Sequence, residues 1–182
     1  MDFVGFPKIA RLSRDIIISE KLDGTNAQIY ITDDGILYSG SRNRWITPED
    51  DNAGFARWCK ENEKELLRLG PGRHFGEWWG QGIQRNYGLK EKRFSLFNTE
   101  RWTDSPDLPS CCHVVPELSR GVFDTELIDL ILQQLILSGS AAAPGFMNPE
   151  GIVIYHTKSN SCFKKTIGND GVPKSLLVNK EK

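Results

Sequence analysis

SEKLDGTNAQIY, residues 19–30, is the stretch that decides the fold. Apolar and β-branched residues just before it, and again at 27–31, predict two strands. Lys21 and Asp23 interrupt the apolar run two positions apart, so we expect both side chains on one face where the first strand ends. Gly24 allows either a sharp turn or a close approach of the backbone to a ligand. The stretch therefore predicts two strands joined by a polar turn.

The bulk composition is typical of a soluble globular protein. The chain has 182 residues, of which 38% are hydrophobic and 26% charged, and its formal net charge is −1. This length suits one domain, and the charge excludes a polycation that binds nucleic acid through its overall charge. No apolar run approaches the ~18 residues of a membrane span, and the start lacks a secretory signal. Four cysteines without CxxC spacing favour reduced thiols, so we expect a cytoplasmic protein without a membrane partner.

The rest of the chain predicts a mixed fold in which strands dominate. Asp34 and Gly35 between apolar flanks predict a hairpin. One helix is expected over residues 48–69 and a second over 125–138, with Asp124 as its N-cap; the second is apolar almost all round, which predicts deep burial. Further strands are expected at residues 73–79, 93–102 and 111–115, and a hairpin at 151–166. These elements predict an α+β fold around antiparallel sheet.

Lys21 is the candidate nucleophile of this sequence. A lysine that is partly removed from water near other cations can lose its proton near neutral pH and attack an electrophile. The alternative is structural, a salt bridge between Lys21 and Asp23 ahead of a turn. A single K-x-D-G match does not decide between them.

Six short stretches, in one order, resemble the motifs of the covalent nucleotidyltransferases. That superfamily contains the ATP-dependent RNA and DNA ligases and the mRNA capping enzymes. The stretches are EKLDG with Lys21, SGSRNR with Arg42, HFGEWWG with Glu77, RFSLFNTE with Phe97 (or Phe94), PEGIVIY with Glu150 and CFKKT with Lys164. The match covers roughly residues 20–166. EKLDGTNA is most similar to the phage-type RNA ligases that repair nicked or broken RNA.

The resemblance implies a fold and a nucleotide site. The fold would be the ligase-type nucleotidyltransferase domain, with antiparallel sheets flanked by helices and the nucleotide pocket between them. ATP would be the cofactor, carried as covalent AMP on Lys21. The other nucleotide-binding residues would be Glu20 at the adenine, Asp23 at the ribose, Gly24 at the close backbone approach, Arg42 at phosphate and ribose, Phe97 stacked on the base and Lys164 at the phosphate.

A divalent metal is also implied by the resemblance. Glu77 and Glu150 would supply oxygen ligands to Mg²⁺ or Mn²⁺, hard cations that favour carboxylates and water. Asn26 would hold the water shell of the metal. These cations would neutralise the α-phosphate and stabilise charge that develops in the transition state.

The implied reaction is RNA sealing. AMP would pass from Lys21 to a 5′-phosphate on RNA, and a 3′-hydroxyl would then displace AMP and join the strands. The alternatives are a DNA ligase, a GTP-using capping-type enzyme, and a nucleotide- or RNA-binding module without full ligation activity. Trp78 and Trp79 are expected to pack in the core rather than stack on a base. The basic run at 85–93 suits a solvated loop better than an RNA contact.

Two features depart from the family pattern. Strand alternation places Lys164 and Thr166 on one face and Lys165 on the other, so Thr166 stands where a second lysine is common. The chain is expected to form a single minimal nucleotidyltransferase domain over residues 1–182, without a C-terminal OB-fold or other appended domain. A separate protein would then supply further grip on the nucleic acid. We expect a monomer, in the host cytoplasm if the protein is phage-encoded.

Overall fold

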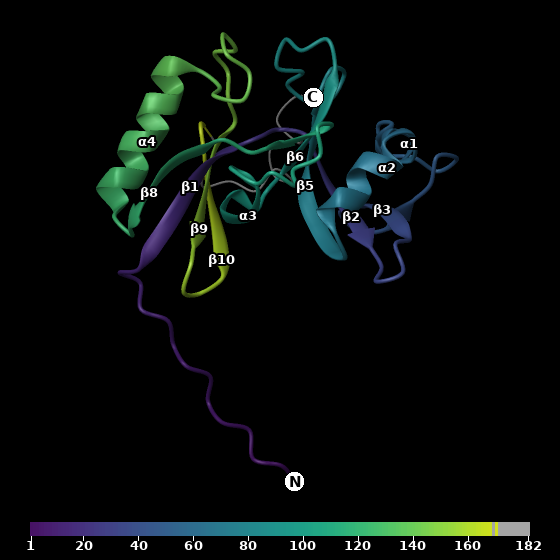
Figure 1. Ribbon diagram of the computed structural model, residues 1–182. Helices are drawn as coiled ribbons and strands as arrows, with labels where there is room; N and C mark the ends of the chain where they lie inside the picture. The colour runs from purple at the N-terminus through teal and green to yellow at the C-terminus, as the bar shows by residue number, and fades with distance from the viewer. Residues whose placement is uncertain (169, 171–182) are drawn as a thin grey trace, which may run out of the picture.

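Two β-sheets lie side by side, each with helix on its outer side (Figure 1). The computed structural model describes residues 1–168 and 170. The first sheet has the order β10 (Ser161–Thr166), β9 (Gly151–His156), β1 (Asp15–Lys21) and β8 (Glu117–Val122). The second has the order β4 (Trp45–Ile46), β3 (Leu37–Ser41), β2 (Thr25–Ile31), β5 (Gly72–Gly80), β6 (Lys92–Leu96) and β7 (Cys112–Val114). This arrangement confirms the expected α+β class.

The chain crosses from the first sheet to the second at the polar interruption of the opening stretch. β1 ends at Lys21 and β2 begins at Thr25. β1 is a central strand of the first sheet, while β2 pairs with β3 and β5 in the second. All strand pairs are antiparallel except β6 with β7, which is parallel and was not predicted. The residues between Lys21 and Thr25 therefore lie where the two sheets meet.

Three apolar clusters hold the fold together. α4 (Thr125–Ser138) packs Ile128, Ile131 and Leu135 on the first sheet, next to β1 and β9. The second sheet packs on α1 (Phe55–Glu61) and α2 (Glu63–Leu66), which is followed by the 3₁₀ turn η1 (Leu67–Leu69). A smaller cluster, including Leu22 and Trp79, fills the junction between the sheets. Each large apolar side chain buried in this way stabilises the fold by roughly 1.5–3 kcal/mol.

The first predicted helix is wrong in its N-terminal part. Residues 48–54 are not helical, and the helix begins at Phe55. Ala53 and Gly54 have φ values of 52° and 85°, in the left-handed region, which a right-handed helix cannot contain. Asp51 accepts hydrogen bonds from the backbone N–H groups of Ala56 and Arg57 at 2.8 and 3.2 Å, and so satisfies the free donors of the first turn.

Three further expectations need correction. The strand expected at 93–102 ends at Leu96, because Asn98 accepts a hydrogen bond from the N–H of Arg101 and caps the short helix α3 (Thr99–Trp102). β8 was not predicted at all. α4 has the predicted cap, with Asp124 accepting from Glu126 N–H, but it is not deeply buried on all sides. Leu137 is 77% exposed on its outer face.

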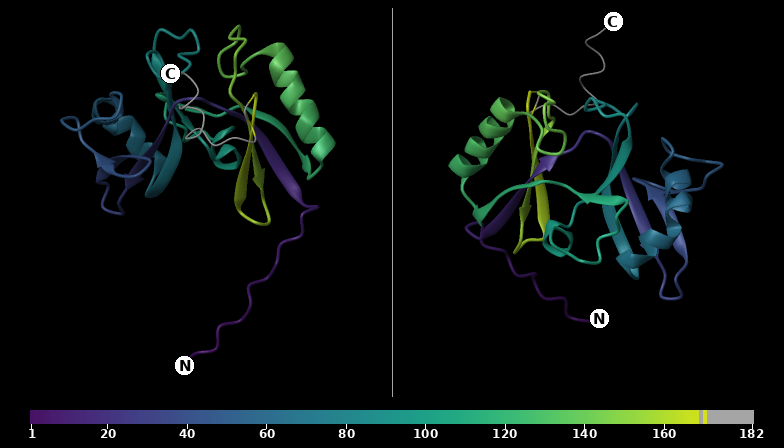
Figure 2. Two further views of the ribbon diagram at one scale, coloured as in Figure 1. Left: turned by 180° about the vertical axis from the view of Figure 1, so that it is seen from behind. Right: turned by 45° about the horizontal axis from the view of Figure 1, so that its top comes forward.

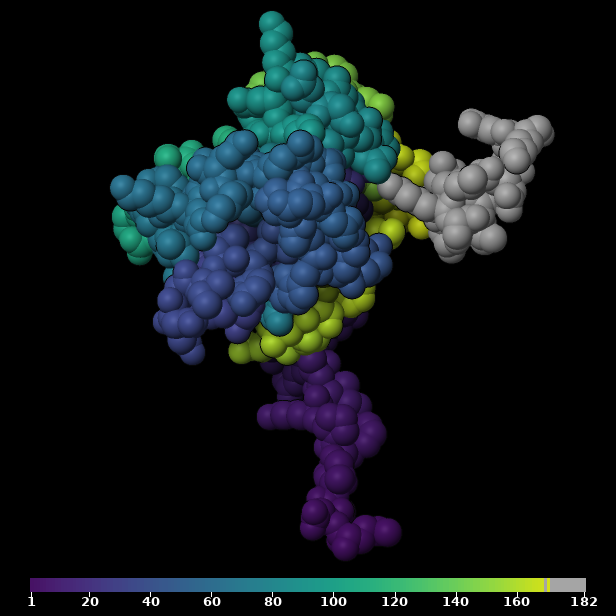
Figure 3. Space-filling view, turned by 90° about the vertical axis from the view of Figure 1, so that its right-hand side faces the viewer, coloured from purple at the N-terminus to yellow at the C-terminus, as the bar shows by residue number. Residues whose placement is uncertain are grey.

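Two further views complete the arrangement. Figure 2 shows the first residues of the chain (purple) leaving the two sheets as an extended arm, and residues 1–12 of this arm are exposed. Figure 3 looks onto the outer side of the second sheet, where the region from β3 through α2 (blue) faces the viewer. Over the described part of the chain, no helix combines the length and apolar character needed to cross a membrane.

Candidate active site

Lys21 and Glu150 form an ion pair where β1 ends and β9 begins. Lys21 Nζ lies 2.7 Å from Glu150 Oε2, and the Glu150 side chain is only 3% exposed. Strand register brings them together, since Lys21 pairs with Gly151, the residue after Glu150. The Lys21–Asp23 salt bridge considered from the sequence is not formed. The candidate nucleophile instead points at a carboxylate 129 residues away.

Glu77 anchors the turn that follows Lys21. Its carboxylate accepts hydrogen bonds from the Gly24 N–H at 3.0 Å and from the Asn26 side-chain amide at 2.9 Å. Burial raises the pKa of Glu77 to about 7, against the hydrogen bonds and the charge of Lys21, which lower it. Glu150 acts in the same direction as burial. Lys21, Glu77 and Glu150 therefore interact electrostatically in one site.

Gly24 is required by the packing of the second sheet. A Cβ at this position would lie 2.4 Å from the Trp78 carbonyl oxygen and 2.7 Å from Trp79 Cβ.

We expect Gly24→Ala to lower the free energy of unfolding by about 1–3 kcal/mol or more, because β5 must shift to make room. Urea denaturation measures this. Gly121→Ala is the matched control, since its Cβ would meet only Leu127 Cδ2 at 3.6 Å; equal stability of the two variants contradicts the expectation.

Asp23 is held by two residues that the sequence did not reveal. Arg85 Nε donates to Asp23 Oδ2 at 2.9 Å, and the Asp23 N–H donates to the Tyr87 hydroxyl at 2.8 Å. Arg85 also donates to the side chain and carbonyl of Asn148 at 2.9 and 3.2 Å. Residues 81–90 form a loop whose side chains are mostly exposed, as expected, but the Arg85 guanidinium in that loop is engaged by Asp23 and Asn148. It ties the Lys21–Gly24 turn to the loop that carries Glu150.

Removing Arg85 is expected to slow the chemistry of this site. Arg85→Ala leaves Asp23 without its guanidinium partner and frees Asn148, two residues before Glu150. A hydrogen bond to a charged group contributes about 1.5–3 kcal/mol, so the rate of the covalent nucleotide attachment that the sequence resemblance implies for Lys21 should fall about tenfold or more. Single-turnover adduct formation measures this rate. Arg93→Ala is the control from the same basic run, because Arg93 pairs with the neighbouring Glu91; an equal loss in both variants would refute the assignment.

Glu20 is buried on the other face of β1 from Lys21. Its side chain is 1% exposed, and Oε2 accepts a hydrogen bond from the Ala142 N–H at 2.9 Å. Oε1 has no hydrogen-bond partner among the described residues. Burial raises the pKa of Glu20. A buried carboxylate oxygen without a donor is costly, and a ligand that brings a donor would relieve that cost.

Lys164 and Thr166 share a face of the first sheet with Lys21. β10 pairs with β9 so that Thr166 lies opposite Gly151, which in turn lies opposite Lys21, and Lys164 lies two residues further along, opposite Val153. Lys165 is on the other face, where it pairs with Asp129 of α4. The alternation predicted from the sequence is therefore confirmed.

Arg42 and Phe97 belong to the second sheet. Arg42 follows β3, where the chain bends, and its side chain is exposed. Phe97 follows β6 and is 43% exposed. The alternative stacking residue, Phe94, is excluded because it is fully buried against Phe55. Trp78 and Trp79 are both buried, which confirms that they pack in the core.

The acidic residues of the site suit a weakly held hard cation. Within the described residues, no group of three or more metal-ligating side chains is assembled. Mg²⁺ is commonly bound by one or two carboxylates and completes its shell with water and substrate phosphates. Glu77 and Glu150, with the amide of Asn26 beside Glu77, fit that pattern.

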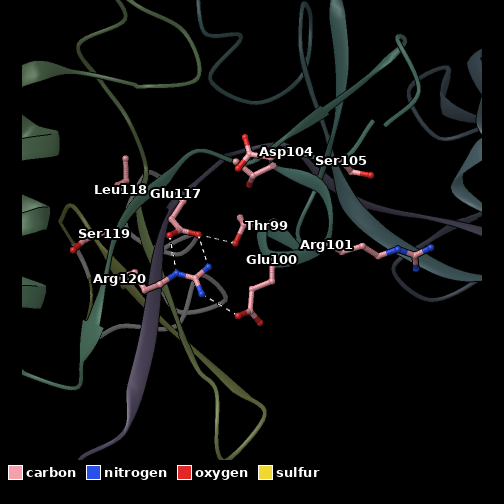
Figure 4. A pocket seen from close by; sticks show the side chains of 10 residues that line it. Thr99, Glu100, Arg101, Asp104, Ser105, Glu117, Leu118, Ser119 and Arg120 are labelled. Atoms are coloured by element: carbon pink, nitrogen blue, oxygen red, sulfur yellow. Dashed lines mark hydrogen bonds and ion pairs between the residues drawn. The ribbon is translucent and has the colours of Figure 1, made fainter. Parts of the chain in front are cut away.

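A separate polar cavity of about 600 Å³ lies between α3 and β8 (Figure 4). Glu117 accepts hydrogen bonds from Thr99 at 3.1 Å and from Arg120 at 3.0 Å, and Arg120 also reaches Glu100 at 3.0 Å. Hydrogen bonds from Arg120 hold the pKa of Glu117 below its usual value. None of the predicted site residues lines this cavity. The side chains that line this cavity connect α3 to β8, a strand of the first sheet.

The comparisons agree with this fold. The family model described as RNA ligase matches residues 14–167, and the chain belongs to the RNA ligase family. No curated protein matches the chain. Among solved structures, it is similar to Naegleria gruberi RNA ligase with PPi, at 21% identity and a TM-score of 0.63, over 93% of this chain and 53% of that one.

Other structures of the same Naegleria gruberi protein match in the same way. A lysine-to-methionine variant with AMP and Mn has 22% identity and a TM-score of 0.65, over 85% of this chain and 50% of that one. A lysine-to-alanine variant with ATP and Mn has 21% identity and a TM-score of 0.62, over 85% and 49%. At this identity the likeness establishes the fold. The chain spans about half the length of these proteins.

Proposed function

We propose that this chain is an ATP-dependent RNA ligase that carries AMP on Lys21. The observation that supports this most strongly is the Lys21–Glu150 pair, 2.7 Å apart and next to Glu77, in a chain of the RNA ligase family. Lys21 must lose a proton before it attacks, and Glu150 is placed to accept it. Lys21 Nζ then forms a bond to the α-phosphorus of ATP, the bond from that phosphorus to the bridging oxygen breaks, and pyrophosphate leaves.

The nucleotide would lie between the two sheets. Oε1 of Glu20, which has no hydrogen-bond partner among residues 1–168 and 170, is proposed to accept from the exocyclic amino group of adenine. Phe97, exposed at the end of β6, is proposed to stack on the base, and Asp23 to hold the ribose. Arg42 would contact phosphate and ribose from the second sheet. Lys164 would contact the phosphate from the first sheet.

Mg²⁺ or Mn²⁺ is proposed at Glu77 and Glu150, with Asn26 holding its water. The metal would neutralise phosphate charge when bound. Mn is present with ATP or AMP in the structures of Naegleria gruberi RNA ligase described above. Glu77 keeps its hydrogen bonds to Gly24 and Asn26 in this arrangement, so the metal site and the turn after Lys21 are coupled.

The substrate is proposed to be RNA with a 5′-phosphate and a 3′-hydroxyl. AMP passes from Lys21 to the 5′-phosphate, and the 3′-hydroxyl then attacks that phosphorus, forms the phosphodiester and releases AMP. We propose that residues 1–182 act as one nucleotidyltransferase unit, as a monomer in the cytoplasm. A separate protein would supply further grip on the nucleic acid, while every residue assigned to the first step lies in this chain.

Sealing assays on matched substrates test this function. Nicked RNA and nicked DNA of one sequence are incubated with the protein, Mg²⁺, and either ATP or GTP. Sealing of the RNA with ATP supports the proposal. Preference for nicked DNA favours the DNA ligase, and activity with GTP favours the capping-type enzyme. ATP binding by calorimetry without any covalent adduct would instead identify a nucleotide-binding module.

A further inference from the structure

The inner face of the second sheet carries a row of side chains beyond the candidate active site. Register places Asn26 opposite Glu77, Gln28 opposite Phe75 and Tyr30 opposite Arg73. Side chains of directly opposed residues share a face, so this series extends outward from Glu77 along β2 and β5. α1 and α2 cover the other face, where Ala27, Ile29 and Ile31 are buried. The row therefore begins at the candidate active site and runs away from it.

Three aromatic rings cluster at the outer part of this row. Tyr38 of β3 lies opposite Tyr30, and their ring centroids are 6.3 Å apart. Trp45 of β4 lies 5.8 Å from Tyr38 and 6.1 Å from Tyr30. Gly40 makes room for this packing, since a Cβ there would lie 3.1 Å from the Trp45 ring. Tyr38 and Trp45 are nevertheless 45% and 46% exposed, so their rings are held in place but open to solvent.

The charge of the cluster is positive. The Arg73 guanidinium lies over the rings of Tyr30 and Trp45, at 4.7 and 5.4 Å from their centroids, and donates to Gln28 at 3.0 Å. Within the described residues, neither Arg73 nor Arg42 forms an ion pair, unlike Arg44, which pairs with Asp50. Apart from Glu77, the residues of β2, β3 and β5 on this face include no carboxylate. Among these strand residues, Glu77 at the active-site end of the row is therefore the one carboxylate that would repel an anionic strand.

We propose that Tyr30, Tyr38, Trp45 and Arg73 form a stacking platform for a single-stranded segment of the RNA substrate. Exposed aromatic rings beside unpaired arginines suit single-stranded nucleic acid, because bases stack on the rings and the cations attract the phosphates. Phe75, which is 52% exposed, and Phe97 continue the aromatic surface toward Glu77. The platform leads the strand toward Lys21. This inference rests on the proposed RNA ligase function.

Binding of a fluorescent single-stranded RNA of about 12 nucleotides tests the platform, measured by anisotropy at fixed salt. The double variant Tyr38→Ala and Trp45→Ala is expected to bind about tenfold more weakly or worse, since stacking on one ring contributes about 1–3 kcal/mol per base. The double variant Tyr38→Phe and Trp45→Phe keeps an aromatic ring at both positions and should bind within about threefold of the wild type. Phe163→Ala is the matched control, an exposed phenylalanine on the first sheet, and should bind as the wild type does.

Adduct formation with ATP in the absence of RNA separates the two proposals. A wild-type protein without an adduct overturns the proposed ligase function, whatever the RNA result. A wild-type protein that forms the adduct but binds no RNA overturns the platform alone. The platform is also overturned if the alanine double variant binds RNA as tightly as the wild type, or if the phenylalanine double variant loses as much affinity as the alanine variant.

Discussion

Replacing Lys21 with alanine is expected to abolish the covalent attachment of AMP. Lys21 Nζ, at the end of β1 and beside Glu150, is the atom proposed to bond to the α-phosphorus. Loss of a nucleophile commonly costs several orders of magnitude, so we expect the adduct to fall by about 1000-fold or more. ATP labelled at the α-phosphate, followed by denaturing gel electrophoresis, measures the adduct.

Lys165→Ala is the matched control for this experiment. Lys165 lies in the same sheet, but its side chain is on the opposite face and pairs with Asp129. The control should keep the adduct at close to the wild-type level. An undiminished adduct in Lys21→Ala would show that another residue is the nucleophile. Circular dichroism of both variants establishes that each is folded.

Glu77→Gln is expected to change how stability depends on pH. Burial raises the pKa of Glu77 from 4.5 to about 7, so the folded state holds a proton that the unfolded state releases at lower pH. The contribution of Glu77 to wild-type stability should therefore be largest below pH 4.5 and fall as the pH rises through 7. A shift from 4.5 to about 7 corresponds to about 3 kcal/mol. The glutamine variant has no proton to lose, so this part of the pH dependence should disappear.

Urea unfolding without metal or nucleotide, at pH values from about 4 to 8, measures this difference. Subtracting the Glu77→Gln curve from the wild-type curve isolates Glu77, because Glu20 and the other titrating groups are common to both. Glu91→Gln, at an exposed glutamate, is the control and should follow the wild type. The free energy of unfolding of the Glu77→Gln variant is subtracted from that of the wild type at each pH. A difference that does not change with pH would show that folding does not raise the pKa of Glu77.

Local patterns in the sequence predicted much of the candidate site. The apolar runs around Lys21 predicted both strands, and strand alternation correctly separated Lys164 and Thr166 from Lys165. Lys21 and Glu150 are 129 positions apart in the sequence. Their pairing depends on the register between β1 and β9, the strand that begins right after Glu150. Composition and spacing do not encode this register. The order of motifs that resembles the covalent nucleotidyltransferases indicated both Lys21 and Glu150 without knowledge of this register.

Contacts between distant segments explain what the sequence did not predict. Arg85 pairs with Asp23, 62 positions earlier, and nothing in the local run of basic residues marks it as different from Arg93. The start of α1 depends on the left-handed backbone at Ala53, which acidic residues over 49–51 do not reveal. In the same way, Gly24 is required by the Trp78 carbonyl oxygen, which only the packing of β2 on β5 brings close.

The most direct test of the central claim is to locate the covalent nucleotide. The wild-type protein is incubated with ATP and Mg²⁺, digested, and its peptides are analysed by mass spectrometry. We predict a mass increase of one AMP on the peptide that contains Lys21, with a bond that is stable to base and labile to acid, as a phosphoramidate should be. AMP attached at any other residue, or no attached AMP, would contradict the account.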